Sequence, residues 1–216
     1  MITNIFIQAR MSSSRFPGKV LASLNNKTII KYILESAKKV KIAHKVVVLT
    51  SGEESDDPLA YYLKQLGCNY FRGNLNDVFD RFQSAATVFP CDYLVRLSAD
   101  SPFLDSDLIT FMIQQALDYH ADITSNVIVR TFPKGQSVEV IKTKTLLEID
   151  KALLTQEERE HVFPYFYRNK DKFKIRSIKN NGDESDIHMC IDTWQDLVRL
   201  SLARNSYKFQ QNVYAE

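Results

Sequence analysis

The chain is poor in cysteine and carries almost no excess charge of either sign. Its 216 residues include three cysteines, none in a C-x-x-C pair, and 28 basic against 26 acidic side chains, a formal net charge of +2. An odd number of cysteines without paired spacing argues against a disulfide framework or a zinc site and suits a reducing cytosol. A net charge this small argues against a nucleic-acid partner, so any basic patch is local.

Long apolar runs and the common glycine motifs for phosphate are also missing. No run approaches the length of a membrane span, and the N-terminus lacks a basic segment followed by an apolar one. We therefore predict a cytoplasmic protein without a membrane partner. Neither G-x-x-x-x-G-K-[ST] nor G-x-G-x-x-G occurs, which excludes a P-loop and a dinucleotide-binding fingerprint.

What the chain contains over its first 125 residues is a regular alternation of strand and helix patterns. Short apolar runs rich in β-branched residues alternate with apolar stripes at helical spacing. We expect strands near 5–7, 45–50, 68–71, 92–97 and 121–125, and helices near 26–37, 57–66, 75–89 and 105–117. This order predicts an α/β fold with a mostly parallel sheet and helices on both faces, in one domain over residues 1–216.

The alternation changes after residue 127. The pattern there predicts a turn at 133–135, strands at 137–141, 173–178 and 187–191, and helices at 144–153 and 156–167. We therefore expect a small inserted α+β subdomain at approximately 130–180. Thr193 and Asp196 then have the spacing of a capping box, which predicts the start of a final helix.

The most informative stretch follows the first strand. Residues 8–21 read QARMSSSRFPGKVL, in which Arg10, Arg15 and Lys19 accompany three consecutive serines and a Pro-Gly turn. Small polar residues let backbone N–H groups converge on an anion, and the cations neutralise its charge. Because open α/β sheets bind ligands beyond the carboxyl ends of their strands, we interpret this stretch as a triphosphate-binding loop. The structural alternative is a solvated basic loop.

Two aspartates each follow an apolar strand pattern, Asp100 after residues 92–97 and Asp192 after residues 187–191. A Mg²⁺ ion bound to a triphosphate takes one or two carboxylates together with phosphate oxygens and water. If both strands end at the same edge of one sheet, these carboxylates meet at such an ion. The structural alternative is that each aspartate caps the helix that follows it.

Six stretches resemble one protein family. Residues 7–21 are similar to the Q-A-R-M-x-S-x-R-x-P-G-K-x-L opening of the spore-coat polysaccharide biosynthesis protein F group. That group lies within the cytidylyltransferases that make CMP-linked acidic sugars such as CMP-neuraminate and CMP-3-deoxy-manno-octulosonate. The other stretches are 72–81 (R-G-x-x-x-D-V-L-x-R), 95–102 (V-R-x-T-x-D-x-P, with Ser98 for the commoner Thr), 133–140 (P-x-G-x-x-V-E-V), 159–162 (R-E-H-V) and 191–197 (V-D-T-x-x-D-L).

The resemblance implies a Rossmann-like nucleotidyltransferase fold and a definite reaction. CMP would pass from CTP to an acidic sugar of the nonulosonic or ulosonic type, with release of pyrophosphate, for surface polysaccharide biosynthesis. It implies that Mg²⁺ is held by Asp100 and Asp192, and that the inserted subdomain binds the sugar and builds a homodimer. The implied site residues are Arg10, Arg15 and Lys19 for catalysis; Gln8, Ala9, Arg10, Met11, Ser12, Ser13, Arg15, Lys19, Arg72, Gly73 and Asp77 for the nucleotide; and Glu139, Arg159 and His161 for the sugar.

Several of these assignments have structural alternatives. Asp77 and Arg81, four residues apart on a predicted helix, have the spacing of a surface ion pair. Glu139 and His161 stand among apolar residues, so both are also candidates for buried groups that need partners. The aromatic residues of 163–167 are equally candidates for a subunit interface.

Other functions also stay open. The acceptor is alternatively a sugar phosphate or polyol phosphate. A glycosyltransferase of similar architecture would use Asp105-Ser106-Asp107 as a D-x-D metal motif. A protein that binds a nucleotide without turning it over is the non-enzymatic alternative.

Overall fold

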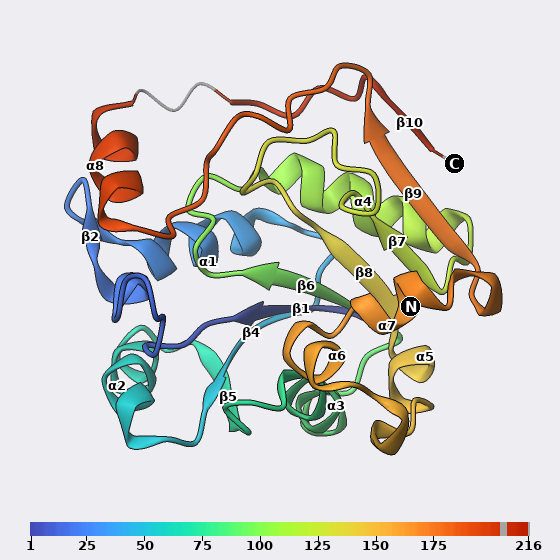
Figure 1. Ribbon diagram of the computed structural model, residues 1–216, viewed down its shortest axis with the longest axis horizontal. Coiled ribbons are helices and arrows are strands. Elements are labelled where there is room, and N and C mark those ends of the chain that lie inside the picture. The colour runs from blue at the N-terminus through green and yellow to red at the C-terminus, as the bar shows by residue number, and fades with distance from the viewer. Residues whose placement is uncertain (204–206, 216) are drawn as a thin grey trace.

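The centre of the molecule is an eight-stranded sheet. The computed structural model describes residues 1–203 and 207–215, and Figure 1 shows the sheet with helices on both sides. The strand order is β10-β9-β7-β8-β6-β1-β4-β5. The bounds are β1 (Thr3–Gln8), β4 (Lys45–Ser51), β5 (Asn69–Gly73), β6 (Tyr93–Ser98), β7 (Ile123–Ser125), β8 (Glu139–Lys142), β9 (Ile175–Asn180) and β10 (Val213–Ala215), with a separate hairpin of β2 (Ser23–Leu24) and β3 (Lys27–Thr28).

The register of the central strands sets the position of the site. Strand β1 runs parallel to both β4 and β6, and Gln8 lies opposite Ser98 at the carboxyl ends of β1 and β6. Strand β8 is antiparallel to β6 and to β7, so the sheet is mixed on that side. Because β1 and β6 end at the same edge, the loops that follow them leave the sheet side by side.

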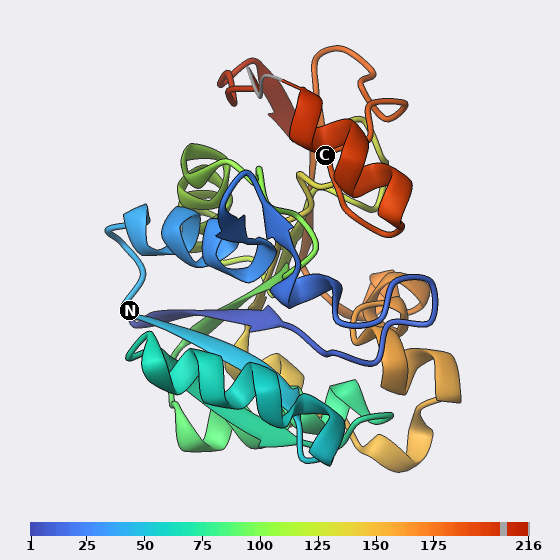
Figure 2. The ribbon, with the colours of Figure 1, turned by 90° about the vertical axis from the view of Figure 1, so that its left-hand side faces the viewer.

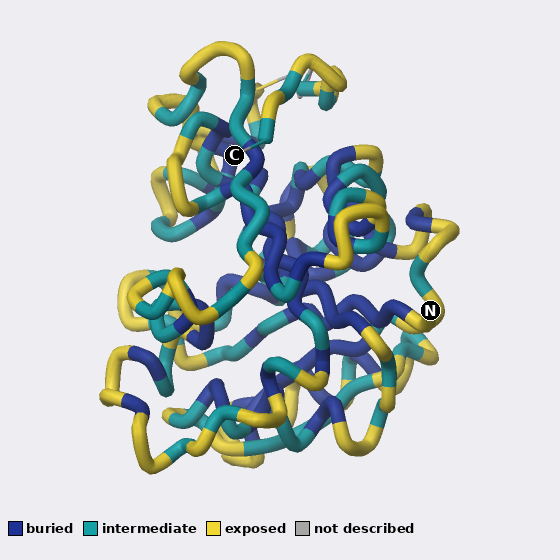
Figure 3. Tube along the Cα trace, turned by 90° about the vertical axis from the view of Figure 1, so that its right-hand side faces the viewer, coloured by how far each residue is buried: buried dark blue, intermediate teal, exposed yellow. Residues whose placement is uncertain are grey.

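The two faces of the sheet bury different helices because side chains alternate along each strand. Ile5 and Ile7 face one apolar cluster, which includes residues of α1, α2 and α4. Phe6 faces the other, which includes residues of α3, α5 and α7. The helices are α1 (Ile29–Lys39), α2 (Asp57–Gln65), α3 (Val78–Val88), α4 (Ser106–Asp118), α5 (Thr143–Leu147), α6 (Gln156–His161), α7 (Pro164–Arg168) and α8 (Trp194–Leu202), with short 3₁₀ turns η1 (Lys19–Leu21), η2 (Glu54–Asp56), η3 (Lys151–Leu153) and η4 (Lys170–Lys172). Figure 3 shows the buried sheet beneath exposed loops.

The predicted fold class is confirmed. Strands lie at all six positions where the sequence predicts them up to residue 141. Residues 130–180, expected as an inserted subdomain, place β8 and β9 in the main sheet and pack α6 against α3. The capping box of Thr193 and Asp196 at the start of α8 is also confirmed. All three cysteines are free thiols.

The predicted strand at 187–191 is wrong. The segment makes a single bridge, between Lys134 and His188, and is otherwise an extended connection. Its backbone bonds go to loops: Met189 N–H donates to Lys134 O at 2.7 Å, and Ile191 N–H donates to Asp100 O at 2.8 Å. Ile191 is apolar because it packs under α8, in a cluster with Leu197 and Leu200, and not because it joins the sheet.

Several elements differ in extent from the sequence expectation, among them the helix expected at 144–153, which is divided into α5 and η3. Helix α3 begins at Val78 and not near residue 75, because the Asp77 side chain accepts the Asp80 N–H and caps the helix there. The helix expected at 156–167 is divided into α6 and α7. Residues 27–28 form the second strand of a hairpin whose turn places Asn25 and Asn26 at φ 47° and 65°, a left-handed conformation that asparagine tolerates.

Candidate active site

The loop after β1 folds back on itself and directs Lys19 toward the ends of other strands. Gly18 N–H donates to Met11 O at 2.7 Å, which closes the loop, and Gly18 has φ 73°, a conformation that favours glycine. Lys19 then begins the short 3₁₀ turn η1. Figure 2 shows this loop between α8 on one side and α6 and α7 on the other.

Lys19 is the centre of the site. Its buried ammonium group donates to Asp100 Oδ2 at 3.0 Å, Asp192 Oδ1 at 3.0 Å and Ile191 O at 2.8 Å. Burial alone would lower the pKa of Lys19, but the charges and hydrogen bonds of Asp100 and Asp192 outweigh it and raise that pKa above the ordinary value. The ammonium therefore stays charged and joins two aspartates that are far apart in the sequence.

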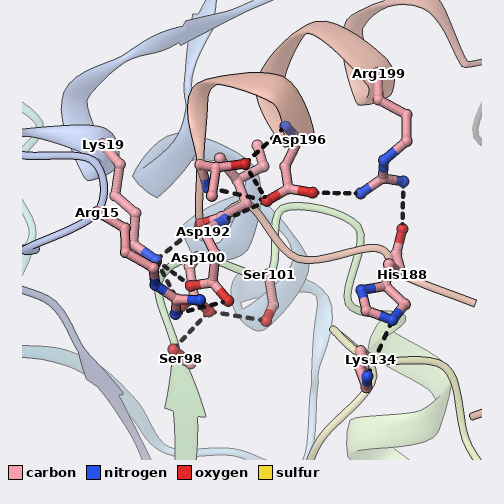
Figure 4. A network of polar contacts seen from close by, with 12 residues as sticks. Arg15, Lys19, Ser98, Asp100, Ser101, Lys134, His188, Asp192, Asp196 and Arg199 are labelled. Carbon is pink, nitrogen blue, oxygen red and sulfur yellow. Dashed lines mark hydrogen bonds and ion pairs between the residues drawn. The ribbon is translucent and has the colours of Figure 1, made fainter.

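Both aspartates have further partners (Figure 4). Arg15 Nη2 lies 3.1 Å from Asp192 Oδ2. Asp100 Oδ1 accepts hydrogen bonds from the Ser98 hydroxyl at 2.7 Å and the Ser101 hydroxyl at 3.2 Å. The two carboxylates are therefore held in fixed orientations, each with one oxygen on Lys19.

Asp192 owes its position to the start of α8. Its backbone N–H donates to Asp196 Oδ2 at 3.1 Å, and Asp196 also closes the capping box with Thr193. Burial would raise the pKa of Asp196, but hydrogen bonds from Arg199, Thr193 and two backbone N–H groups outweigh it and lower that pKa to about 2. A capped helix start thus presents Asp192 to the first loop.

These groups surround a cavity of about 260 Å³ at the edge where β1 and β6 end. It is lined by residues of the first loop, the end of β6, α6 and the segment before α8: Gln8, Ala9, Arg10, Ser13, Ser14, Arg15, Lys19, Val20, Ser98, Ala99, Asp100, His161 and Asp192. The structure thus brings together all three predicted loop cations and both predicted metal-binding aspartates.

Helix α6 forms one wall of the cavity through a strained turn. Arg10 Nη2 lies 3.6 Å from Glu160 Oε1 on α6, and the next residue, His161, lines the cavity. Val162 follows at φ 65° and ψ −59°, and Phe163 N–H donates to His161 O at 2.8 Å. This is a classic γ-turn, which is strained for a β-branched residue. Because Val162 is fully buried, packing holds the turn and with it the direction of His161.

The three predicted nucleotide residues beyond the first loop do not line the cavity. The Arg72 guanidinium donates to Ser51 O and Glu53 O, each at 2.8 Å, and pairs with Asp57, so it fastens β5 to the end of β4. A Cβ on Gly73 would lie 3.0 Å from Arg81 Cγ, so the glycine makes room for that side chain.

Asp77 and Arg81 do not form the ion pair that their spacing suggested. Asp77 pairs with Arg159, which also donates to Lys151 O. Arg81 is fully buried, donates from Nη1 to Asn74 O at 2.7 Å, and has no partner for Nε or Nη2 among the described residues. Burial lowers the pKa of Arg81 to about 10, with a smaller contribution of the same sign from Arg10 and an opposing one from Asp56.

Of the three predicted sugar residues, only His161 lines the cavity. Glu139 is buried, and its two oxygens accept hydrogen bonds from Tyr167 and Arg96. Glu139 is therefore a buried group with partners inside the protein, which is the structural alternative given above for this residue. The candidate interface aromatics Phe163 and Phe166 are buried in the core beside α3.

Two further predicted loop residues, Met11 and Ser12, do not line the cavity. Met11 presents its backbone N–H to Asp56 Oδ1 at 2.6 Å, while Ser12 is exposed and outside the cavity lining. Asp56, which sequence reasoning missed, is fully buried and also accepts hydrogen bonds from Thr50 Oγ1 and Ser51 N–H at 2.8 Å. It fastens the first loop to the end of β4. Two adjacent acidic residues before a proline gave no signal that one of them is buried.

Asp105-Ser106-Asp107, the metal motif of the glycosyltransferase alternative, lies at the start of α4 and has a structural role. Asp105 caps α4 by accepting the Asp107 N–H at 2.7 Å, and its other oxygen accepts the Phe209 N–H at 3.0 Å. Asp107 is exposed. These contacts leave no pair of free carboxylates at this position.

A divalent cation fits the oxygens around Lys19. Among residues 1–203 and 207–215 no cluster of three or more His, Cys, Asp and Glu side chains has the geometry of a metal site. The Lys19 ammonium is nevertheless surrounded by three hard oxygen atoms, two from carboxylates and one from a backbone carbonyl. This donor set suits Mg²⁺ together with phosphate oxygens.

Of the described helices, none is both long and apolar enough to cross a bilayer.

Comparison with known proteins identifies the family. The cytidylyltransferase family matches residues 4–214. An uncharacterised protein of Methanocaldococcus jannaschii is 33% identical over 198 residues (88% of this chain, 78% of that protein), and spore coat polysaccharide biosynthesis protein SpsF of Bacillus subtilis is 30% identical over 197 residues (88% and 81%). The solved structure of a cytidylyltransferase from Leptospira borgpetersenii superposes with a TM-score of 0.88 at 35% identity, covering 93% of this chain and 85% of that one. The chain therefore belongs to the cytidylyltransferase family, and it is a CTP-dependent nucleotidyltransferase.

Proposed function

We propose that the protein transfers CMP from CTP to an acidic sugar of the nonulosonic or ulosonic type, with release of pyrophosphate, for surface polysaccharide biosynthesis. The observation that carries this proposal is the meeting of Arg15, Lys19, Asp100 and Asp192 at one cavity. The relative named for spore coat polysaccharide biosynthesis supports the pathway class.

In this proposal the loop cations bind the triphosphate. Arg10, Arg15 and Lys19 all line the cavity. A hydroxyl oxygen of the acceptor forms a bond to the α-phosphorus, the bond from that phosphorus to the bridging oxygen breaks, pyrophosphate leaves, and the hydroxyl proton passes to solvent. Such a reaction depends on positioning and on neutralising the charge that develops on the phosphates, which fixed cations supply.

Asp100 and Asp192 would hold Mg²⁺. The ion would contribute charge neutralisation at the phosphates and a lower pKa for the attacking hydroxyl. Ser98 and Ser101, which donate to Asp100, keep that carboxylate in a fixed orientation. Asp196 does the same for the backbone of Asp192.

The nucleoside would lie along Gln8, Ala9 and Ser13, which line the cavity. Backbone groups near Ala9 and the Arg72–Gly73 turn would read the base. Arg72 and Asp77 would support this turn indirectly, because their side chains are engaged with Ser51, Glu53 and Arg159.

The acceptor would lie against α6. His161 is the cavity residue from that helix, and Arg10, which also lines the cavity, lies 3.6 Å from the neighbouring Glu160. A carboxylate on the acceptor would find a cation here. Glu139 and Arg159 would act by holding α7 and α6 in place, since Glu139 accepts from Tyr167 and Arg159 pairs with Asp77.

The test is pyrophosphate release from CTP with Mg²⁺ and a panel of acidic sugars. We expect turnover with at least one nonulosonic or ulosonic acid, and loss of turnover without unfolding in Lys19→Ala and Asp192→Asn. Lys27→Ala, which removes a lysine paired with Glu35 outside the cavity, serves as the matched control and should keep full turnover.

Other outcomes would redirect or refute the assignment. Turnover only with a sugar phosphate or polyol phosphate would change the acceptor class. Release of a nucleoside diphosphate would indicate a glycosyltransferase, and CTP binding without any turnover would indicate a binding protein. Near-normal turnover in either site variant would refute the residue roles.

We also propose that the protein is a cytoplasmic homodimer. The ground is the family resemblance, since in related synthetases the region that corresponds to residues after 130 forms the dimer contact. Light scattering on the purified protein tests the assembly, which should have twice the mass of one chain. A monomer at working concentration would refute this part alone.

A further inference from the structure

We propose that Lys19 is an exchangeable counter-ion, which occupies the cation position between Asp100 and Asp192 until a divalent metal and a polyphosphate arrive together. The proposal rests on the proposed function of this cavity as a site for a metal-bound nucleoside triphosphate, and it concerns the order and coupling of binding. It predicts that metal and polyphosphate each bind weakly alone and strongly together.

The geometry around the ammonium group carries this inference. Nζ of Lys19 lies 3.0 Å from Asp100 Oδ2, 3.0 Å from Asp192 Oδ1 and 2.8 Å from Ile191 O. All three donations of the ammonium are thus spent on the oxygens that would hold a metal. A divalent ion at this place must first displace a buried, positively charged side chain.

The loop cations are occupied in the same way. Arg15 pairs with Asp192 Oδ2 at 3.1 Å, and Arg10 lies 3.6 Å from Glu160. An anion that arrives alone must therefore compete with Asp192 and Glu160 for these arginines, and at Lys19 it would take away the ammonium that Asp100 and Asp192 share. The solvent-accessible arginine pairs cost little to separate, whereas the partly buried carboxylates are costly to leave without the Lys19 ammonium.

A metal-bound polyphosphate removes both obstacles at once. The metal replaces the ammonium at Asp100 and Asp192, while the phosphate oxygens replace the carboxylates at Lys19 and Arg15. Each partner that is lost is exchanged for one of the same charge. By linkage, the factor by which polyphosphate strengthens metal binding equals the factor by which metal strengthens polyphosphate binding.

The first test measures Mn²⁺ binding alone, by electron paramagnetic resonance of the free ion, in the wild type and in Lys19→Met. Lys19→Met takes away the ammonium that Asp100 Oδ2, Asp192 Oδ1 and Ile191 O share. We therefore expect this variant to bind Mn²⁺ about tenfold or more tightly than the wild type, within the range of ordinary coupling factors. Adding Asp192→Asn to Lys19→Met should abolish the gain. Lys27→Met, which removes a lysine from its pair with Glu35 outside the site, should leave Mn²⁺ binding unchanged.

The second test is the reciprocal one and does not depend on Lys19→Met folding. Inorganic triphosphate is titrated into the wild type and Asp192→Asn by calorimetry, with a chelator present to remove metal. Asp192→Asn removes the ion pair of Arg15 and one of the two ion pairs of Lys19, so we expect about tenfold tighter binding of triphosphate.

The outcomes separate this proposal from the proposed function. If Lys19→Met binds Mn²⁺ no more tightly than the wild type, or if Asp192→Asn gains nothing for triphosphate, the exchange is refuted even when CTP is turned over. If both gains appear but CTP with Mg²⁺ shows no turnover on any acceptor, the exchange stands and the reaction assignment fails.

Discussion

The strained turn at Val162 predicts that a glycine variant at this position is not less stable than the alanine variant, as it would be at an ordinary buried position. Val162 is fully buried and has φ 65°, so replacing it has two opposing effects. Val162→Ala removes buried methyl groups, at a cost of about 2 kcal/mol, and keeps the strain. Val162→Gly removes one carbon more, about 0.8 kcal/mol, and adds the backbone freedom of glycine, about 0.5–1 kcal/mol. It also relieves a left-handed conformation that costs about 1–2 kcal/mol in an L-residue.

These terms nearly cancel, so we expect Val162→Gly to be about as stable as Val162→Ala. The matched control is Val95, which is also fully buried but lies in strand β6 with ordinary backbone geometry. There glycine should be less stable than alanine by roughly 1–2 kcal/mol, because of its backbone freedom and the lost methyl group. Urea denaturation followed by circular dichroism gives all four values. Equal glycine–alanine differences at the two positions would refute the strain.

The same variants connect the turn to function. Because the γ-turn sets the direction of His161, Val162→Gly should raise the KM for the acceptor while leaving the KM for CTP near the wild-type value. A change in both constants would show that the turn supports the whole cavity and not the acceptor wall alone.

Two further predictions concern charged groups outside the cavity. Arg81→Met should change the free energy of unfolding by less than about 2 kcal/mol, because losing the bond to Asn74 O is offset by removing a buried guanidinium. Two nitrogens of this guanidinium have no partner within 1–203 and 207–215. A loss above about 4 kcal/mol in urea denaturation would contradict this prediction. Asp196 has its pKa lowered to about 2 when folded, so its contribution to stability is complete above the ordinary carboxyl pKa and is lost as the pH falls toward 2. After discounting for solvent exposure this amounts to about 1 kcal/mol. Stability measured from pH 5 to pH 2.5 should fall less steeply in Asp196→Asn, and parallel curves would contradict the assignment.

Sequence reasoning predicted the parts of the site in which charged residues directly follow a predicted strand. Arg15 and Lys19 follow a buried strand, and Asp100 follows another, so topology alone brings them to one edge of the sheet. Asp192 reaches the same place although the strand predicted before it does not exist. The apolar pattern of residues 187–191 reports burial under α8, which periodicity does not distinguish from burial in a sheet.

The parts that sequence reasoning missed depend on tertiary partners. Arg72 and Glu139 occupy positions of family motifs, yet their side chains are engaged with Ser51 and Tyr167 and do not line the cavity. Asp56 is buried because three hydrogen bonds, one from the loop after β1 and two from the end of β4, compensate its charge. Nothing in the local sequence encodes such partners, because they come from segments that are distant along the chain.

The backbone hydrogen bond from Ile191 to Asp100 O, beside the bonds from Lys19 to Ile191 and Asp192, has a consequence for folding. Partners 172 and 173 positions apart along the chain are among the slowest contacts for a polypeptide to make. Catalytic competence should therefore arrive late in refolding, after the sheet has given most of its circular dichroism signal. It should also be the first property to disappear when denaturant loosens α8, so that turnover reports on the integrity of the final helix earlier than any spectroscopic probe of the core.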